Sequence, residues 1–167
     1  MDGNGRWAKE RGLSRLEGHR HGTQNVRRVL DACSKHGLAV VTLYVFSTEN
    51  WGRPQEEIDG FFELLAQVID RETDNFCQQG VRLVHSGALD GVPRVLADKV
   101  ARAVEVTRAN RDYLLNVAFN YGGRAEILRA VQRMLAEKIV PDALSEELFN
   151  RYLYTAGMGD MDLVIRT

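Results

Sequence analysis

The chain begins with a glycine-rich stretch whose residue types suit the binding of a phosphate group. Gly3 and Gly5 flank Asn4, and glycines in such a stretch let backbone N–H groups approach an anion closely. Arg6 adds a planar fork of donors for phosphate oxygens. Asp2 would repel a phosphate unless a hard cation such as Mg²⁺ bridges the two groups, so the stretch predicts a metal-assisted phosphate site. The alternative is an ordinary Asn-Gly turn or a flexible chain end.

Strand and helix patterns alternate along the rest of the chain. Residues 38–46 form a nearly unbroken apolar run, which is typical of a strand covered on both faces. Three further strands are predicted at 81–85, 113–120 and 162–166. Apolar residues at helical spacing predict helices around 26–33, 58–76, 92–104, 127–135 and 145–152. The alternation predicts one α/β domain over residues 1–167, with a mostly parallel central sheet flanked by helices.

Two predicted loops lie where such a sheet binds ligands, at the carboxyl ends of its strands. The loop at 47–54 reads Ser-Thr-Glu-Asn-Trp-Gly-Arg-Pro, and the loop at 120–124 reads Asn-Tyr-Gly-Gly-Arg. We expect both loops to lie near the N-terminal stretch, at one edge of the sheet.

Composition narrows the class of protein. The 22 basic and 23 acidic side chains give a net charge of −1, which argues against a nucleic-acid-binding module, and no Gly-Lys-Ser/Thr phosphate loop is present. A basic stretch at 6–28 suits a small anionic substrate. Cys33 and Cys77 fall within apolar helical patterns, which predicts two buried thiols in a reducing compartment. No apolar run reaches the length of a membrane span. We therefore expect a cytoplasmic protein, with peripheral attachment to the membrane as a second option.

Four motifs, in order, resemble those of the cis-prenyltransferase (undecaprenyl diphosphate synthase-like) family. They are Asp-Gly-Asn-Gly-Arg-Trp at 2–7, followed by Arg15, Gly18 and His19; the loop at 47–54; the loop at 120–124; and Asp-Leu-Val-Ile-Arg-Thr at 162–167. The resemblance implies a Mg²⁺-dependent condensation of isopentenyl diphosphate with an allylic diphosphate such as farnesyl diphosphate. New double bonds would be cis, and the product would be a polyprenyl carrier lipid for the cell wall. It also implies a homodimer that delivers its product to the membrane.

The resemblance also implies roles for individual residues. Asp2 would be the essential catalytic carboxylate and the Mg²⁺ ligand. The allylic diphosphate would bind residues of the N-terminal third: Gly3, Asn4, Gly5, Arg6, Trp7, Arg15 and His19. Further substrate contacts would come from the loop after the first predicted strand: Ser47, Thr48, Glu49, Trp51 and Arg53.

The resemblance also bears on Asn50, Arg124 and Arg166. The resemblance implies Asn50 as a catalytic proton acceptor, but a neutral amide is a very weak base, so we expect it to orient isopentenyl diphosphate while the departing diphosphate or His19 takes the proton. Arg166 is implied as a contact to isopentenyl diphosphate. For Arg124, a substrate role and a structural role in a strand-to-helix turn, paired to an acid, are equally open.

The sequence departs from the family at both ends. Family members have a strand leading into the first motif and a further C-terminal segment, and this chain is expected to lack both. We therefore expect weak or no activity from these 167 residues alone. The alternatives are an inactive fragment, a non-catalytic partner subunit of the same fold, or a phosphate- or RNA-binding module. The product length and the allylic primer are left open by the sequence.

Overall fold

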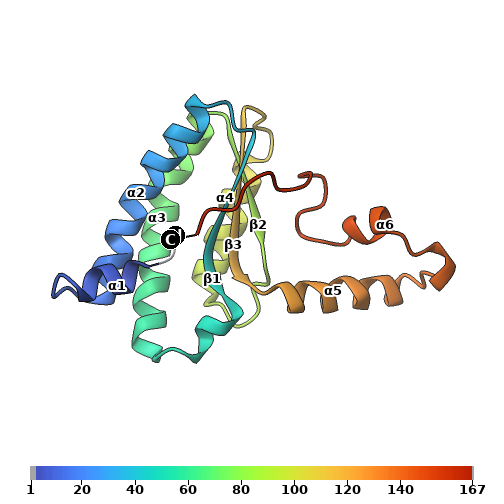
Figure 1. The fold of residues 1–167 in the computed structure, drawn as a ribbon, viewed down its shortest axis with the longest axis horizontal. Coiled ribbons are helices and arrows are strands. Elements are labelled where there is room, and N and C mark those ends of the chain that lie inside the picture. The colour runs from blue at the N-terminus through green and yellow to red at the C-terminus, as the bar shows by residue number, and fades with distance from the viewer. Residues whose placement is uncertain (1–2, 167) are drawn as a thin grey trace.

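A computed structural model describes residues 3–166, so Met1, Asp2 and Thr167 lie outside the described part. The helices and strands are, in chain order, α1 (Asn4–Lys9), α2 (Arg15–Lys35), β1 (Val40–Ser47), the 3₁₀ helix η1 (Thr48–Gly52), α3 (Gln55–Gln78), β2 (Val81–Ser86), α4 (Arg94–Thr107), β3 (Tyr113–Tyr121), α5 (Gly123–Ala136), the 3₁₀ helix η2 (Pro141–Ala143) and α6 (Glu146–Asn150) (Figure 1). The predicted helices and the first three predicted strands are confirmed.

The described sheet has three parallel strands in the order β1-β3-β2. Val40 of β1 lies opposite Leu114, and Val81 of β2 lies opposite Tyr113. The central strand β3 is flanked on both edges and is the most buried of the three. Because the strands are parallel, their carboxyl ends and the loops that follow them meet at the same edge of the sheet.

One face of the sheet is covered by α2, α3 and α4. A buried apolar cluster joins strand residues such as Leu83 and Leu115 to Ala103 of α4, and Leu30 of α2 packs against it. A second cluster, around Phe46 and Phe119, lies closer to the carboxyl ends. Figure 1 shows α2 and α3 on one side of the sheet and α5, α6 and the C-terminal segment on the other.

Local signals explain where the long helices begin and end. The Ser14 hydroxyl accepts a hydrogen bond from the Glu17 N–H at 3.2 Å and caps α2. Gly37 follows this helix with a φ of 72°, a left-handed conformation that favours glycine. Pro54 precedes α3, whose first turn carries Glu56 and Glu57 near the positive end of the helix dipole.

Two expectations from the sequence are wrong. Residues 162–166 form no strand, and Leu163, Val164 and Ile165 are 71%, 72% and 81% exposed. Apolar β-branched residues favour a strand only where a neighbouring strand pairs with them, and none of the strands in residues 3–166 does so. The two thiols are also less buried than expected, since Cys33 is half-buried and Cys77 is exposed. Cys77 lies near the end of α3, away from the apolar face of that helix. Neither thiol forms a disulfide.

None of the helices within residues 3–166 has the length and apolar composition needed to cross a bilayer.

Candidate active site

The turn after β1 is held in shape by its own side chains. The Ser47 N–H donates a hydrogen bond to Asn50 Oδ1 at 3.1 Å, and the Ser47 side chain in turn accepts from the backbone of η1. This reciprocal capping box fixes the conformation of 47–52. Thr48 lies against Gly122, since a Cβ at that glycine would be 2.4 Å from Thr48 Oγ1. The turn after β1 and the start of α5 are therefore packed together.

The short helix α1 packs closely on α2 because two glycines of α2 face it. A Cβ at Gly18 would lie 2.3 Å from the backbone oxygen of Asn4, and a Cβ at Gly22 would lie 2.5 Å from Asn4 Nδ2. Glycines one turn apart thus let α1 approach to a distance that no other residue type allows. This contact places the N-terminal glycine-rich stretch beside the first turns of α2, which carry Arg15 and His19.

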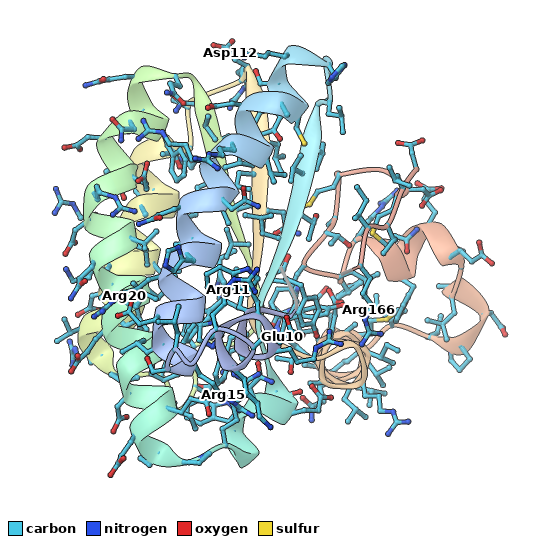
Figure 2. The ribbon with its side chains drawn as sticks, turned by 60° about the vertical axis from the view of Figure 1, so that its left-hand side comes forward. Glu10, Arg11, Arg15, Arg20, Asp112 and Arg166 are labelled. Carbon is cyan, nitrogen blue, oxygen red and sulfur yellow. The ribbon has the colours of Figure 1, made fainter. Side chains whose placement is uncertain are left out.

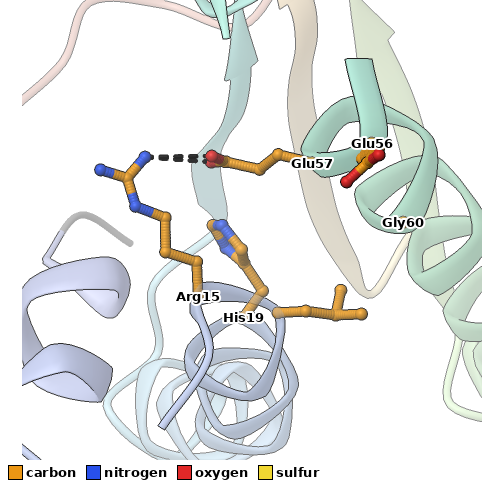
Figure 3. Close-up of a pocket in the computed structure, with 6 residues that line it drawn as sticks. Arg15, His19, Glu56, Glu57 and Gly60 are labelled. Atoms are coloured by element: carbon orange, nitrogen blue, oxygen red, sulfur yellow. Dashed lines mark hydrogen bonds and ion pairs between the residues drawn. The ribbon is translucent and has the colours of Figure 1, made fainter. Parts of the chain in front are cut away.

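Arg15 and Arg53 converge on the carboxylate of Glu57, and Figure 3 shows the contact between Arg15 and Glu57. Arg15 Nη1 lies 3.0 Å from Glu57 Oε2, and Arg53 Nη1 lies 3.0 Å from Glu57 Oε1. The Glu57 side chain is only 16% exposed, Arg53 is 34% exposed and Arg15 is 63% exposed. Two segments that are distant in sequence, the start of α2 and the loop before α3, therefore bring two guanidinium groups to one place. The sequence alone did not single out Glu57, although an acid one helical turn after Arg53 is a signal for such a pair.

His19 lies beside this cluster, with its ring edge-on to Phe61 at a centroid distance of 5.2 Å. Burial lowers the pKa of His19 below its usual value of 6.5, and the nearby Arg53 charge lowers it further. At neutral pH the imidazole is therefore uncharged, and one ring nitrogen is able to accept a proton.

Two hollows border these residues. The first, of about 210 Å³, is lined by Arg15, Leu16, His19, Glu56, Glu57 and Gly60 (Figure 3). The second, of about 490 Å³, is more open and is lined by Gly5, Arg6, Lys9, Gly12, Leu13 and Arg15. Arg15 belongs to both. Figure 2 shows Arg15 at one end of the molecule and Asp112, which precedes β3, at the other, so the hollows lie toward the carboxyl edge of the sheet.

The other predicted site residues occupy different surroundings. Trp7 packs against His21 of α2 at 4.9 Å, and the Arg11 guanidinium lies 4.5 Å above its ring. Glu49 is exposed, and hydrogen bonds from its own backbone and from Ser47 lower its pKa. The positive charge of Arg124 also lowers the Glu49 pKa, so the acid that Arg124 interacts with electrostatically is Glu49.

Two predicted site residues lie at the ends of the chain. Asp2, the predicted metal ligand, lies outside the described residues. Arg166 lies in the exposed C-terminal segment. Within residues 3–166, no three His, Cys, Asp or Glu side chains come close enough together to hold a metal ion.

Trp51 and Asn120 connect two loops. Trp51 Nε1 donates a hydrogen bond to Asn120 Oδ1 at 2.8 Å, and the indole ring packs edge-on against Phe46 and Phe62. The sequence placed Asn120 in a strand-to-helix turn but gave no sign of this bond, because the two residues are 69 positions apart.

Comparison with known proteins places this geometry in a family. Residues 1–167 match the family described as "Putative undecaprenyl diphosphate synthase". The chain is 45% identical over 170 residues to an isoprenyl transferase of Heliobacterium mobile, which covers 99% of this chain and 65% of that protein. It is 37% identical over 171 residues to the ditrans,polycis-undecaprenyl-diphosphate synthase ((2E,6E)-farnesyl-diphosphate specific) of Legionella pneumophila (strain Paris), covering all of this chain and 72% of that protein.

The fold agrees with these sequence matches. The crystal structure of lavandulyl diphosphate synthase from Lavandula x intermedia, in complex with dimethylallyl diphosphate, superposes with a TM-score of 0.88 at 27% identity, over 93% of this chain and 68% of that one. A probable undecaprenyl diphosphate synthase from Campylobacter jejuni superposes with a TM-score of 0.73 at 32% identity, over 80% of this chain and 64% of that one. The chain thus spans about two thirds of the length of these relatives. It belongs to the undecaprenyl diphosphate synthase (isoprenyl transferase) family.

Proposed function

We propose that this protein is a cis-prenyltransferase that joins isopentenyl diphosphate to an allylic diphosphate, such as farnesyl diphosphate, to make a polyprenyl carrier lipid. The observation that carries the proposal is the convergence of Arg15 and Arg53 beside the neutral His19, at a hollow between the first turns of α2 and α3. Family membership and the names of the relatives support the same reaction.

The two arginines match the main electrostatic task of this reaction. Negative charge grows on the diphosphate as it leaves the allylic carbon, and donors aimed at that charge stabilise the transition state more than the ground state. Arg15 lines the hollow, and Arg53 lies behind it on the same Glu57 carboxylate with its side chain two-thirds covered by protein, so both supply planar donors near the bound group. Glu57 holds the two guanidinium groups in place before the substrate arrives, so less ordering is needed on binding.

The size of the first hollow suits the head of the substrate. Its volume of about 210 Å³ is below the ~300–1,000 Å³ of pockets that enclose a whole ligand. We infer that the diphosphate binds here and that the prenyl chain extends along α2 and α3, where Leu16 and Phe61 offer half-buried apolar surface.

A Mg²⁺ ion fits the charges around the site. Arg15 and Arg53 already share the Glu57 carboxylate, so the positive charge that they offer a diphosphate is partly neutralised and a further cation is favoured. Asp2, one position before the Gly3 cap of α1, is the residue that we propose to hold the ion together with diphosphate oxygens. Bound Mg²⁺ would offset the charge of the leaving group.

The second substrate would be positioned by the turn after β1. Ser47 and Asn50 lie within one short segment that leads into Arg53, and we propose that this segment and Arg166 bind isopentenyl diphosphate. The Asn50 amide oxygen already accepts the Ser47 N–H, which supports a role in shaping the turn and not as a base. The proton lost from the new bond would pass to the departing diphosphate or to the uncharged imidazole of His19.

We further propose that the whole protein acts as a homodimer and releases its lipid product to the membrane. An exposed apolar face on α5 supports a protein contact, since Ile127, Leu128, Val131 and Leu135 are 41–69% exposed. No role in nucleic-acid binding is proposed, because the net charge is close to zero.

An incorporation assay tests the proposed reaction. Radiolabelled isopentenyl diphosphate is supplied with farnesyl diphosphate and Mg²⁺, to this chain and to a version extended at both ends to the length of its relatives. We expect Mg²⁺-dependent polyprenyl product from the extended version, and loss of most of that product when Asp2 or Arg53 is replaced by alanine. Normal turnover by the Asp2→Ala variant of the extended version would contradict the proposed metal role. Absence of product from the active-site-intact extended version would favour a non-catalytic partner subunit.

A further inference from the structure

Asn120 is a buried polar residue at the end of β3 with an unusual backbone conformation. Its φ is 50°, and it is 6% exposed. Residues other than glycine rarely adopt a left-handed conformation, and asparagine is among those that tolerate it best. The conformation turns the chain at the point where the central strand ends, and it directs the amide into the space between neighbouring loops.

The Asn120 amide joins the loops that follow all three strands. Its Oδ1 accepts the Trp51 Nε1–H at 2.8 Å, and Trp51 follows β1. Its Nδ2 donates to the backbone oxygen of Ala88 at 2.9 Å and to that of Asp90 at 3.1 Å, and both residues follow β2. In return, the Ala88 N–H donates to the Asn120 backbone oxygen at 3.2 Å. Both amide hydrogens and the amide oxygen are thus used within the protein.

The loop after β2 is shaped to reach this amide. Gly87 has a φ of 137°, and a Cβ there would lie 2.1 Å from the backbone oxygen of Phe119. Only glycine therefore lets the loop pass so close to the end of β3. Further along the same loop, a Cβ at Gly91 would be 3.7 Å from the Trp51 ring, so the loop also borders the indole.

The bond to Asn120 fixes one orientation of the Trp51 indole. The ring packs edge-on against Phe46 and Phe62, with centroid distances of 5.6 Å to each. Packing restricts where the ring lies, and a half-buried indole N–H needs an acceptor, which Oδ1 supplies. Trp51 belongs to η1, the same short turn that carries Asn50 and leads into Arg53.

We propose that Asn120 is a positioning residue that holds the turn at 47–53 in its substrate-binding shape by anchoring Trp51 to the ends of the other two strands. In this role Asn120 acts on the substrate through Trp51, because its amide groups are already bonded within the protein. This proposal rests on the function proposed above, in which the turn binds isopentenyl diphosphate. Loss of the anchor should therefore raise KM for isopentenyl diphosphate more than it lowers kcat.

Two substitutions separate the parts of this role. Asn120→Gly keeps the backbone conformation without strain but removes all three side-chain hydrogen bonds. Asn120→Asp keeps an acceptor for Trp51 but removes the donors to Ala88 and Asp90. The matched control is Asn116→Ala. Asn116 is a buried amide of the same strand, 1% exposed, and its hydrogen bonds go to Ser86 and Thr42, away from the turn.

Trp51 fluorescence gives a readout that does not depend on activity. The chain has two tryptophans, so in a Trp7→Phe background the emission reports on Trp51 alone. We expect Asn120→Gly to shift the emission to longer wavelength and to raise the acrylamide quenching constant. Asn120→Asp should give an intermediate change, because it keeps the acceptor for Trp51 but places a carboxylate oxygen against the carbonyl oxygens of Ala88 and Asp90. Asn116→Ala should leave both properties unchanged although it lowers the free energy of unfolding.

Steady-state kinetics complete the test, in whichever version of the protein, this chain or the extended one, makes prenyl product. With Trp7 restored, Asn120→Gly should raise KM for isopentenyl diphosphate about tenfold, the scale of one lost hydrogen bond to a positioned group, with a smaller change in kcat. If Asn120→Gly behaves like Asn116→Ala in quenching, the anchoring role is overturned. Changed quenching with unchanged KM overturns the link to the substrate turn. If neither this chain nor its extended version makes prenyl product without these substitutions, the proposed function fails. The fluorescence comparison then still decides whether Asn120 orients Trp51.

Discussion

Arg53 and Glu57 lie one helical turn apart and are joined at 3.0 Å across the start of α3, and the same carboxylate binds Arg15 of α2. The two guanidinium cations, which we propose bind a diphosphate, would repel each other if no negative charge lay between them. Glu57 removes that repulsion and fixes the direction of both side chains. The centre of the site is thus one carboxylate that orders two guanidinium cations.

Replacing Glu57 should weaken the binding of the diphosphate. In Glu57→Ala the guanidinium groups of Arg15 and Arg53 lose their common partner and become disordered, so KM for the allylic diphosphate should rise about tenfold, or ~1.4 kcal/mol. Steady-state kinetics with varied farnesyl diphosphate measures the change. Glu56→Ala is the control. Glu56 is the exposed neighbouring acid of the same helical turn, and its replacement should raise this KM less. A tighter KM in Glu57→Ala would show that Glu57 competes with the substrate and does not prepare the site.

A methyl group at Gly18 should push α1 away from α2. The added Cβ would lie 2.3 Å from the Asn4 backbone oxygen, which is too close for any real contact, so the helices must move apart. We expect Gly18→Ala to lower the free energy of unfolding by about 1–3 kcal/mol and to reduce kcat/KM through the displaced N-terminal stretch. Denaturant unfolding and the incorporation assay measure the two effects.

Gly60→Ala is the control for that substitution. Gly60 also lies within a helix, but its added Cβ would make only ordinary contacts with Leu16 at 3.5 Å. Alanine is the better helix former, so stability should stay equal or rise by up to ~1 kcal/mol. Equal stability losses for Gly18→Ala and Gly60→Ala would contradict the close approach of α1.

The pH dependence should report on His19. Burial, followed by the Arg53 charge, lowers the His19 pKa below 6.5, so the ring stays uncharged until the pH falls below that value. If the uncharged ring accepts or relays the proton, kcat/KM should decline only below pH 6.5, and His19→Gln should remove this acid limb while lowering the plateau.

The same shift has a consequence for stability. In the unfolded chain His19 takes up its proton at a higher pH than in the folded protein, so folding is favoured above about pH 6.5 and loses this contribution as the pH falls through the lowered pKa. The free energy of unfolding, followed from pH 7.5 to pH 5, should therefore fall less steeply for His19→Gln than for the parent chain. An identical slope in both proteins would contradict the lowered pKa.

Glu126 should be important for the attachment of the segment that follows α6. It is 6% exposed, and its carboxylate accepts hydrogen bonds from the Tyr121 hydroxyl and the Tyr154 N–H, each at 2.6 Å. Glu126→Ala would leave two donors without an acceptor and should cost about 2–4 kcal/mol of unfolding free energy. Glu147 is the control. It forms an exposed ion pair with Arg151, so its replacement by alanine should cost less than ~1 kcal/mol of unfolding free energy. Thermal and denaturant unfolding of both variants tests the difference.

The sequence by itself determined the class of fold and the positions of most elements. The apolar run that became β1 and the helical spacing behind α3 depend on local patterns of burial, which repeat every few residues and are visible without a partner. The motifs at 2–7, 47–54, 120–124 and 162–167 also indicated the family. The prediction failed at 162–166, because strand formation needs a paired neighbour as well as suitable residues.

Only the tertiary structure decided how the site is assembled. Arg15 and Glu57 are 42 positions apart, and Trp51 and Asn120 are 69 positions apart, so no local pattern connects either pair. These contacts depend on the strand order, on the glycines of α2 that admit α1, and on the left-handed turn at Asn120. Local propensities specify the elements. The distances between charged and polar side chains on different elements follow from how those elements pack, because packing alone sets the geometry that hydrogen bonds and ion pairs require.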